Sequence, residues 1–456
     1  MIKGKKICLE LADKVAKEAL NLGATQAEVR LVNSASYLTR FAGSAIHQNV
    51  GEANTSLTLR FVLGKRVSTV SSNDTSPESV KSLVEGGYGV AKVIEEDPEF
   101  VSLPEPQPIK ELRGLYVKET AECTPDNRAE MVKALIGEAH GLSPQVKEVA
   151  GALSVTSAEL AVVNSLGVNA YSRAASASLD TTVTSREAGD EGSGTAGDTS
   201  RDIKELDPAK IGREAAERST GSLGARMIEV GDYEVVFEPD VVSSALGYIS
   251  SGLSAQSYQD GTSWMCDLMG QEVFSEQFTL WDDGRDRSGL AFPFDLEGIP
   301  KRKLVLIEEG VPKAVVYDSY TAHKDKEKST GHAGGMGPSP SHLIMKRGDA
   351  TKEEMIAETK KGILVTSFWY VRTVHAKKII ITGMTRDGTW LIENGEIKYP
   401  VKNLRFTDSL LKTFRSLDLV GKEGKRIAGG FDGGAYGGMV VPAIKSRTFL
   451  FTGQTP

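Results

Sequence analysis

Cysteine is scarce in this chain: only Cys8, Cys123 and Cys266 occur among 456 residues. The three lie far apart and form no C-x-x-C pair, which excludes a disulfide framework and a cysteine-rich zinc finger. Such sparse, unpaired cysteine usage is typical of a reducing compartment. The cysteine pattern therefore predicts a cytoplasmic protein.

Long hydrophobic runs and an excess of positive charge are also missing. No stretch approaches the ~20 apolar residues of a membrane-spanning helix. The first twenty residues carry charges throughout and have no apolar core of a signal peptide. The net charge of −7 disfavours a nucleic-acid groove as the main surface. We therefore expect a soluble protein that binds neither membranes nor nucleic acid.

The first part of the chain alternates between helical and strand-like periods. Residues 5–22 have apolar side chains near helical spacing and end at Gly23. Short strands are expected between residues 27 and 72, with a hairpin turn at Leu63-Gly64-Lys65-Arg66. Ser76 followed by Pro77 predicts the start of a second helix. Residues 95–114 are rich in proline and acidic residues and are expected to form a connector.

A second stretch repeats this mixture of elements. Thr124-Pro125 predicts a helix that runs through His140, and residues 148–186 alternate like a β-meander. Residues 186–202 are rich in glycine, serine, threonine and charge, which favours a mobile loop or a β-turn excursion. Asp207-Pro208 predicts one more helix. Strand signals dominate from residue 231 onward.

Together these signals predict an α+β protein. We expect an N-terminal α+β domain with an antiparallel sheet and flanking helices, followed by a β-rich C-terminal domain. The predicted boundaries are residues 1–110 for the N-terminal region, 111–228 for a middle region that continues the same domain, and 229–456 for the C-terminal domain.

Several short motifs carry acids and glycines. Ile307-Glu308-Glu309-Gly310-Val311 and Ile392-Glu393-Asn394-Gly395-Glu396 place glycine between two β runs, as tight hairpins require. Asp282-Asp283-Gly284 and Asp295-Leu296-Glu297-Gly298 supply carboxylates that suit a hard cation, but neither matches the calcium loop. Solvated acids in turns are the favoured interpretation.

Three histidines, His323, His332 and His342, fall within twenty residues and form the main candidate for a metal site. Their spacing of nine and ten residues matches no known ligand pattern. The surrounding glycine, serine, proline and lysine favour a flexible, exposed loop, which seldom supports a metal site. These histidines are weak metal candidates.

The segment 429–439 contains six glycines and could be read as a phosphate cradle. It lacks the Lys-Ser/Thr pair of a P-loop and the G-x-G-x-x-G order. A loop that allows close backbone approach is favoured, for example beside an extended peptide. The sequence contains no G-x-S-x-G motif of a serine hydrolase.

Three motifs in the C-terminal half occur in one order: FPFDLEGIPKRKLVLIEEG at 292–310, DSYTAHKDKEKSTGHA at 318–333 and LIENGEIKYPV at 391–401. This series resembles the C-terminal domain of the TldD/PmbA family of zinc-dependent peptidases. Catalytic members of that family carry HExxxH on a helix upstream of the series. Aligned by hand, Gly247, Tyr248 and Gly252 occupy the places of the first His, the Glu and the second His.

The residues at these positions cannot supply the family's catalytic zinc site. A catalytic zinc needs about three protein ligands from His, Cys, Asp or Glu. Glycine offers no ligand atom, and a tyrosine phenol with a pKa of about 10 is a poor general base at neutral pH. The resemblance places a third ligand at a cysteine near the C-terminus, and no cysteine follows Cys266. No catalytic, cofactor-binding or metal residue is therefore assigned at this motif.

The resemblance implies a PmbA/TldE-type, non-catalytic subunit without a cofactor of its own. The expected partner is a TldD-like subunit that carries the zinc, in a cytoplasmic heterodimer enclosing a channel for short or unfolded peptides. His332 takes the place of an asparagine usual in the family's STGNA-type motif and is expected to line the interior. Two alternatives stay open: a self-sufficient metal-dependent peptidase with a non-standard site, and a homodimeric peptide-binding protein.

Overall fold

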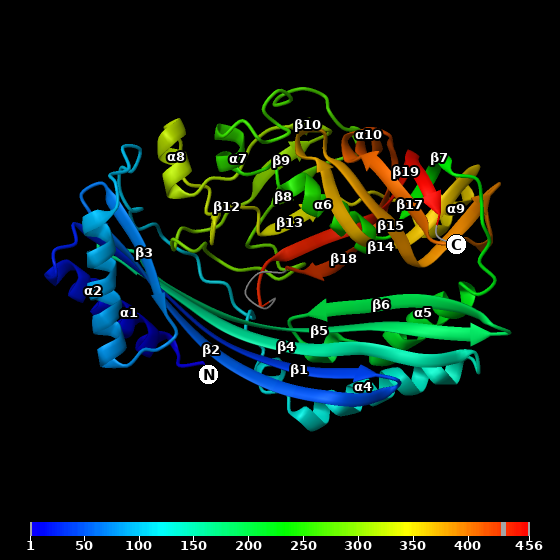
Figure 1. Cartoon of the computed structure of the whole chain (residues 1–456), viewed down its shortest axis with the longest axis horizontal. Helices are drawn as coiled ribbons and strands as arrows, with labels where there is room; N and C mark the ends of the chain where they lie inside the picture. Colours follow the sequence, from blue (N-terminus) through cyan, green and yellow to red (C-terminus); the bar gives the residue numbers. More distant parts are fainter. Residues whose placement is uncertain (1, 430–434, 455–456) are drawn as a thin grey trace.

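A computed structural model describes residues 2–429 and 435–454. Two large β layers dominate it. A curved six-stranded sheet comes from the N-terminal half, and an eleven-stranded mixed sheet from the C-terminal half lies over one side of it (Figure 1). The expected α+β class, with an antiparallel N-terminal sheet and a β-rich C-terminal part, is confirmed.

The six-stranded sheet is built from two copies of one helix–three strands–helix unit, a repeat that was not predicted from the sequence. The strand order β3-β2-β1-β4-β5-β6 places the two units side by side, joined by the antiparallel pair β1–β4. The first unit contains α1 (Lys5–Asn21), β1 (Gln26–Ala42), β2 (Ala45–Leu63), β3 (Arg66–Ser72) and α2 (Pro77–Val93). The second contains α4 (Pro125–Leu142), β4 (Val146–Asn164), β5 (Asn169–Glu187), β6 (Asp190–Ser200) and α5 (Pro208–Gly221). The short helices α3 (Lys118–Ala121) and η1 (Ile203–Glu205) lie between these elements.

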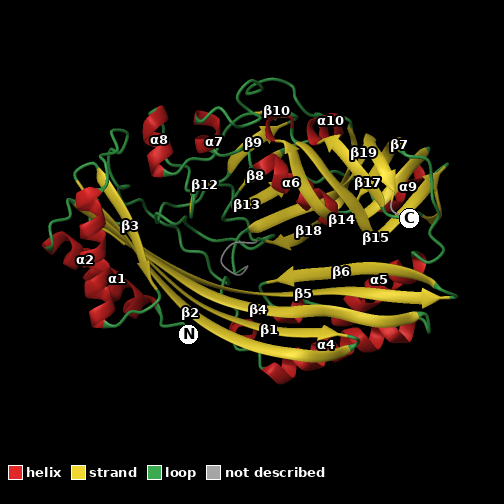
Figure 2. Ribbon diagram, in the orientation of Figure 1, coloured by secondary structure: helices red, strands yellow, loops and turns green. Residues whose placement is uncertain are grey.

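The two faces of this sheet pack against different parts of the protein, as the alternation of side chains along β4 shows. On β4, Val155 packs with the α4–α5 cluster, and Val163 with the α1–α2 cluster. The even-numbered Leu160 and Val162 instead contact Phe292 and Phe294 of the C-terminal half. Because successive side chains of a strand point to opposite faces, the four long helices cover one face and the C-terminal half covers the other (Figure 2).

Three helices of the N-terminal half begin at the predicted N-cap residues. The side chains of Ser76, Thr124 and Asp207 accept hydrogen bonds from the backbone N–H groups three residues ahead. Proline follows each cap at the first helical position. The prediction of several short strands was wrong, since residues 26–63 form only two long strands joined by a tight turn.

The expected loop at residues 186–202 was also wrong, because most of it forms β6. Its glycines allow α5 to lie directly on the strand: a Cβ added to Gly194 would stand 2.4 Å from the carbonyl oxygen of Ala215. At Gly192 the same atom would stand 2.3 Å from the carbonyl oxygen of Ser219. Glycine here marks close helix–strand packing and not a turn.

The C-terminal sheet follows the order β10-β9-β8-β13-β19-β17-β15-β14-β7, with β16 paired to β15 and β18 to β19. Its strands are β7 (Gly231–Phe237), β8 (Leu280–Asp282), β9 (Leu304–Glu308), β10 (Val311–Pro312), β13 (His342–Met345), β14 (Lys361–His375), β15 (Ile380–Glu393), β16 (Glu396–Pro400), β17 (Leu404–Ser409), β18 (Leu417–Ala428) and β19 (Gly438–Gln454). A separate small hairpin pairs β11 (Ala333–Gly334) with β12 (Gly337–Pro338).

The helices of this half are short: α6 (Pro239–Ser250), α7 (Ala255–Gln259), α8 (Ser319–Asp325), α9 (Lys352–Ala357), η2 (Ala376–Lys378) and α10 (Leu410–Arg415). Both predicted hairpins are confirmed, since Glu309-Gly310 has φ of 46° and 79° and Asn394-Gly395 has φ of 52° and 79°. Two consecutive positive φ angles are the requirement of a type I′ turn. Within residues 2–429 and 435–454, no helix combines the length and apolar character needed to cross a membrane.

Charged groups buried between the two halves tie them together. Arg60 of β2 donates to Glu297 of the C-terminal half at 2.9 Å and to Glu28 of β1 at 3.2 Å. Arg201 donates to the backbone carbonyls of Ala175, Ala291 and Ala435, which lie on three separate segments. These contacts hold the loop around residues 291–297 against the sheet.

Candidate functional site

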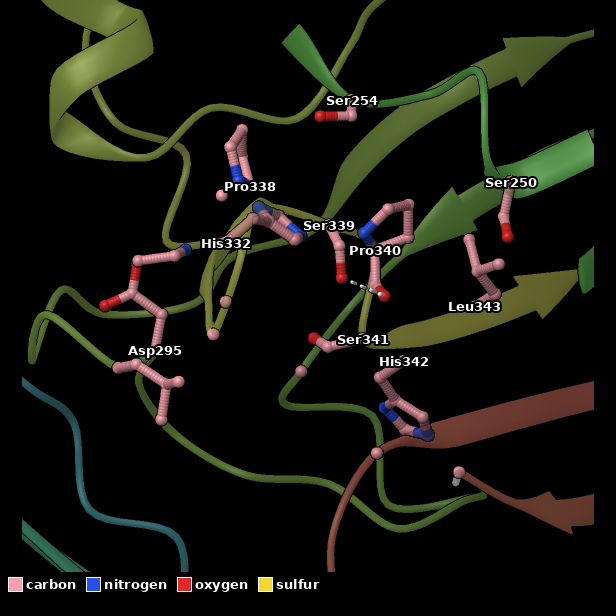
Figure 3. A pocket seen from close by; sticks show the side chains of 18 of the residues that line it. Ser250, Ser254, Asp295, His332, Pro338, Ser339, Pro340, Ser341, His342 and Leu343 are labelled. Atoms are coloured by element: carbon pink, nitrogen blue, oxygen red, sulfur yellow. Dashed lines mark hydrogen bonds between the residues drawn. The ribbon is translucent and has the colours of Figure 1, made fainter. Parts of the chain in front are cut away.

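A cavity of about 640 Å³ opens between the C-terminal half and β4 of the six-stranded sheet. Its walls come from the end of α6 and from α7, from the loop 284–301, from residues 332–343, and from Gly429 and residues 436–439. Figure 3 shows side chains from these segments turned toward one space. The apolar part of the wall includes Leu160, Leu290, Phe292, Phe294, Leu296, Leu343, Tyr436 and Met439. This volume lies within the range of small-molecule and peptide side-chain pockets.

Five polar residues are connected by contacts beside the cavity. Asp282, Lys301, His332, Ser341 and His342 make up this group, which we call the cavity floor. Asp282 ends β8 and lies beneath the others with no exposed surface. The remaining four line the cavity itself.

Asp282 organises the cavity floor. Its Oδ2 accepts the backbone N–H groups of Ser341 and His342, both at 2.7 Å, and its Oδ1 lies 3.0 Å from Nε2 of His332. Burial alone would raise the pKa of this carboxyl, but His332, Lys301 and the backbone N–H of His342 hold it well below its usual range. Asp282 is therefore a buried anion whose hydrogen bonds fix the backbone at residues 341–342.

His342 is held in one orientation. Its Nδ1 lies 2.7 Å from the carbonyl oxygen of Asp283, so this nitrogen carries a proton and donates it. Burial lowers the pKa of His342, which keeps the ring neutral, and its Nε2 has no hydrogen-bond partner among the described residues. Gly289 lies against Nε2, where an added Cβ would come within 2.3 Å. His342 thus positions the floor without carrying charge.

Lys301 brings a cation to the floor. The side chain is only 8% exposed and its ammonium donates to Oγ of Ser341. It reaches this place by crossing Gly284, where an added Cβ would stand 2.1 Å from its Cδ. The absence of a side chain at Gly284, in the Asp282-Asp283-Gly284 motif, therefore lets the Lys301 side chain pass close to the backbone.

The acids of the second motif are buried, and the prediction of solvated turn acids was wrong for Asp282, Asp295 and Glu297. Asp295 accepts backbone N–H groups from Glu297, Ile299 and Ala333. Burial and the neighbouring Glu297 raise the pKa of Asp295 to about 7. Each acid has backbone or side-chain donors at hand, which local sequence does not reveal.

The three positions aligned with HExxxH lie at or just beyond the end of α6. Gly247 is exposed, and an added Cβ would meet nothing within 4 Å. The hydroxyl of Tyr248 donates to the carbonyl oxygen of Val371 at 2.9 Å. Gly252 follows the helix, and an added Cβ would stand 2.2 Å from Cδ1 of Trp264. These residues do not fit a zinc ion, because two lack ligand atoms and the third is hydrogen-bonded elsewhere.

The expected exposed loop holding the three histidines was wrong for two of them. His332 and His342 are 1% and 2% exposed and belong to the cavity floor. His323 lies on α8 and is not part of the cavity wall. The described residues contain no group of three or more His, Cys, Asp or Glu side chains placed to hold a metal ion.

The glycine-rich segment 429–439 lies only partly within the described residues, since 430–434 fall outside them. Gly437 has a φ of +83°, and its added Cβ would come within 2.6 Å of the carbonyl oxygen of Ser341. At Gly438 that atom would come within 2.2 Å of the carbonyl oxygen of Ile427. These glycines therefore let the start of β19 approach the cavity floor closely.

Lys301 and the role of Ser341 were not predicted from the sequence. Both lie beside predicted motifs, Lys301 after the DLEGIP segment and Ser341 directly before His342. A lysine between Pro300 and Arg302 reads as an exposed charge, and only the tertiary structure shows that it is buried.

Three domain models of the PmbA/TldA metallopeptidase family match this chain: domain 1 at residues 27–91, the central domain at 118–223 and the C-terminal domain at 230–453. Metalloprotease PmbA of Escherichia coli O157:H7 is 24% identical over 435 residues, covering 91% of this chain and 93% of that protein.

Solved structures share the whole fold. The crystal structure of TldE from Thermococcus kodakarensis has a TM-score of 0.89 at 22% identity and covers 97% of this chain and 100% of its own. A Thermotoga maritima protein named as a modulator of a DNA gyrase has a TM-score of 0.87 at 19% identity, with 97% and 99% covered. The three matching domain models follow one another over most of the sequence, so the chain belongs to the PmbA/TldA metallopeptidase family.

Proposed function

We propose that this chain is the non-catalytic, peptide-binding subunit of a cytoplasmic metallopeptidase complex that acts on short or unfolded peptides. The catalytic zinc belongs to a TldD-type partner with an intact HExxxH. The names of the similar proteins, a PmbA metalloprotease and a TldE, support this assignment.

The packing around Gly252 is the observation that carries the proposal. A histidine at this position needs a Cβ where Cδ1 and Nε1 of Trp264 stand at 2.2 and 2.3 Å. Trp264 is itself fixed, because its Nε1 donates to the carbonyl oxygen of Ile249 at 2.8 Å and its ring packs against Phe274. The space for a second histidine ligand is therefore filled by a tryptophan that belongs to the core.

The cavity supports the peptide-binding half of the proposal. It lies beside the end of α6 and combines an apolar wall with a polar floor, as binding sites for organic ligands do. The hydroxyls of Ser250, Ser254 and Ser339 along its edge are shown in Figure 3. Hydroxyl groups of this kind both donate and accept, which suits a peptide backbone.

The test is a mixing experiment with an internally quenched, unfolded peptide. The chain alone is expected to give no turnover, and a TldD-type partner with an intact HExxxH is expected to give chelator-sensitive turnover that increases when this chain is added. The matched control is the same partner with the glutamate of HExxxH replaced by glutamine, which should stay inactive in both samples.

A grafted variant sharpens the test. Gly247→His, Tyr248→Glu and Gly252→His together restore two ligands and a base, but Trp264 blocks one of them and no cysteine follows Cys266. Because misplacement by about 1 Å costs on the order of a hundredfold in rate, the graft should stay silent without the partner. Chelator-sensitive turnover by the unmodified chain, free of any partner, would favour the self-sufficient peptidase and refute the proposal.

A further inference from the structure

The cavity floor contains a buried cation without a carboxylate partner. Lys301 is 8% exposed, and no Asp or Glu oxygen of the described residues lies within 4.0 Å of its ammonium. Its one recorded hydrogen bond goes to the neutral Oγ of Ser341. An ammonium group has three donors, so a buried lysine of this kind has donors left for an anion.

The nearby acids are committed to other donors. Oδ2 of Asp282 accepts the backbone N–H groups of Ser341 and His342, and its Oδ1 lies 3.0 Å from Nε2 of His332. Asp295 accepts three backbone N–H groups. The negative charge of Asp282 attracts the ammonium of Lys301, but no carboxylate oxygen of the described residues fills the hydrogen-bonding position beside Ser341.

The residues around Lys301 indicate which kind of anion fits beside its ammonium. Phe292 stacks on Tyr436 with ring centroids 4.3 Å apart, and both line the cavity together with Leu343 and Met439. One ammonium, one hydroxyl and an apolar wall match a monoanionic carboxylate attached to an apolar group. A phosphate dianion is a poorer fit, because such groups are bound by several donors and Asp295 also lines the cavity.

We propose that Lys301 and Ser341 bind the free C-terminal carboxylate of a peptide, whose last side chain lies against the apolar wall formed by Phe292, Tyr436, Leu343 and Met439. This inference rests on the proposed function for the peptide nature of the ligand. It adds that the chain recognises the C-terminal end of its peptide substrate and prefers an apolar C-terminal residue.

The two contact groups are held in place before a ligand arrives. The backbone N–H of Ser341 is bound to Asp282, and its hydroxyl to Lys301 (Figure 3 shows Ser341 next to His342). The Lys301 side chain is confined by Gly284. A site that is ordered in advance loses less conformational entropy on binding.

The experiment measures binding of a fluorescent unfolded peptide ending in leucine to the purified full chain by anisotropy, in EDTA and without a partner subunit. The peptide is compared with the same sequence ending in a carboxamide. The free acid is expected to bind at least tenfold more tightly. Equal affinity of the two peptides would overturn the proposal, even if every variant failed to fold.

Substitutions in the chain test where the C-terminal carboxylate of the peptide binds. Lys301→Met should weaken the free acid about tenfold and leave the carboxamide nearly unchanged, and Ser341→Ala should have the same selectivity with a smaller effect. Lys303→Met removes an exposed lysine two residues away that stacks on Trp281, and it should change neither affinity. A loss for Lys301→Met that is equal for acid and carboxamide would assign Lys301 to structure alone and overturn its role.

A competition experiment distinguishes a site for peptides from a site for small carboxylic acids. N-acetyl-leucine contains the same terminal group but no further backbone, and it should compete at least a hundredfold more weakly than the peptide. Competition as strong as that of the peptide would show a site for small carboxylic acids and overturn the peptide assignment. The assay needs neither metal nor turnover, so its failure is distinct from a failure of the proposed function.

Discussion

Helix α6 and the cavity floor lie close together in the C-terminal half, yet they differ in almost every chemical respect. The positions in and just after α6 that align with a metal motif are two glycines and a tyrosine whose hydroxyl is bound to the backbone. The cavity floor holds an aspartate, a lysine, a serine and two histidines, joined by short contacts. One region lacks ligand atoms, and the other is rich in them.

This difference shows that a chain can lack zinc ligands at one position and still contain a dense polar cluster beside a cavity nearby. Buried polar groups are costly unless their hydrogen bonds are made, so a dense buried cluster in which Nε2 of His342 has no hydrogen-bond partner among the described residues needs a reason to persist. The cavity floor has such a reason if it holds a ligand.

Replacing the centre of the cavity floor should have the largest effect on stability. Asp282→Ala leaves two backbone N–H groups without their acceptor and removes the carboxylate that lies 3.0 Å from Nε2 of His332. Loss of one partner from such a buried cluster costs about 3–5 kcal/mol. Urea denaturation followed by circular dichroism measures the change, with the exposed Asp267→Ala as a control. A loss below about 1 kcal/mol would mean that the floor is not an organised cluster.

Replacing Gly252, just beyond α6, and Gly247, within α6, by alanine should change the stability in opposite directions. Gly252→Ala places a methyl group against Trp264 and should destabilise the protein by about 1–3 kcal/mol. Gly247→Ala adds a methyl group in open space on an exposed helical position and should stabilise it by up to about 1 kcal/mol. Thermal melting of the two variants side by side gives the comparison. If both changes were neutral, position 252 would have room for a ligand after all.

Asp295 should give the stability a dependence on pH. Its folded-state pKa of about 7 lies above the unfolded value, so the proton stabilises the folded chain at low pH. That stability is present below the unfolded pKa and is lost as the pH rises toward 7. His342 acts in the opposite sense, since its folded pKa is lowered and its contribution is lost as the pH falls.

The difference between wild type and Asp295→Asn isolates the first effect. Denaturation midpoints at pH 5, 6, 7 and 8 should show a wild-type curve that declines relative to the variant up to about pH 7 and then runs parallel to it. Parallel curves over the whole range would mean that Asp295 is ionised throughout, in spite of its burial beside Glu297.

The smallest effect is expected for the histidine outside the floor. His323→Ala on α8 should change the free energy of unfolding by no more than about 0.5 kcal/mol, the usual range for substitutions away from buried clusters. His332→Ala, in contact with Asp282, should cost several times more. Similar costs at both positions would remove the distinction between the floor and the rest of the motif.

Local signals explain which parts of the fold the sequence predicted. The caps at Ser76, Thr124 and Asp207 and the Asn394-Gly395 turn depend on a few neighbouring residues, and each was identified correctly. Strand β6 was missed because Gly192 and Gly194 resemble turn residues until α5 is placed over them. The repeated helix–strand unit was missed because its two copies share an arrangement and not a recognisable sequence period.

The candidate site shows more strongly than the fold that local sequence does not predict which residues tertiary packing buries. The absence of ligand atoms at Gly247 and Gly252 could be read from the sequence once the family resemblance supplied the alignment. The burial of Asp282, His332 and His342 could not, because it depends on β8, β13 and the loop 284–301 meeting in space. Glycine, serine and proline around these residues suggested exposure, whereas the glycines in fact permit close packing.

Zinc content tests the central claim most directly. The purified chain, loaded with zinc and then dialysed against metal-free buffer, should retain well under one zinc ion per chain by elemental analysis, because Gly247, Tyr248 and Gly252 offer no ligand set. A TldD-type partner treated in the same way should keep its zinc. One tightly held, dialysis-resistant zinc ion per chain would contradict the account.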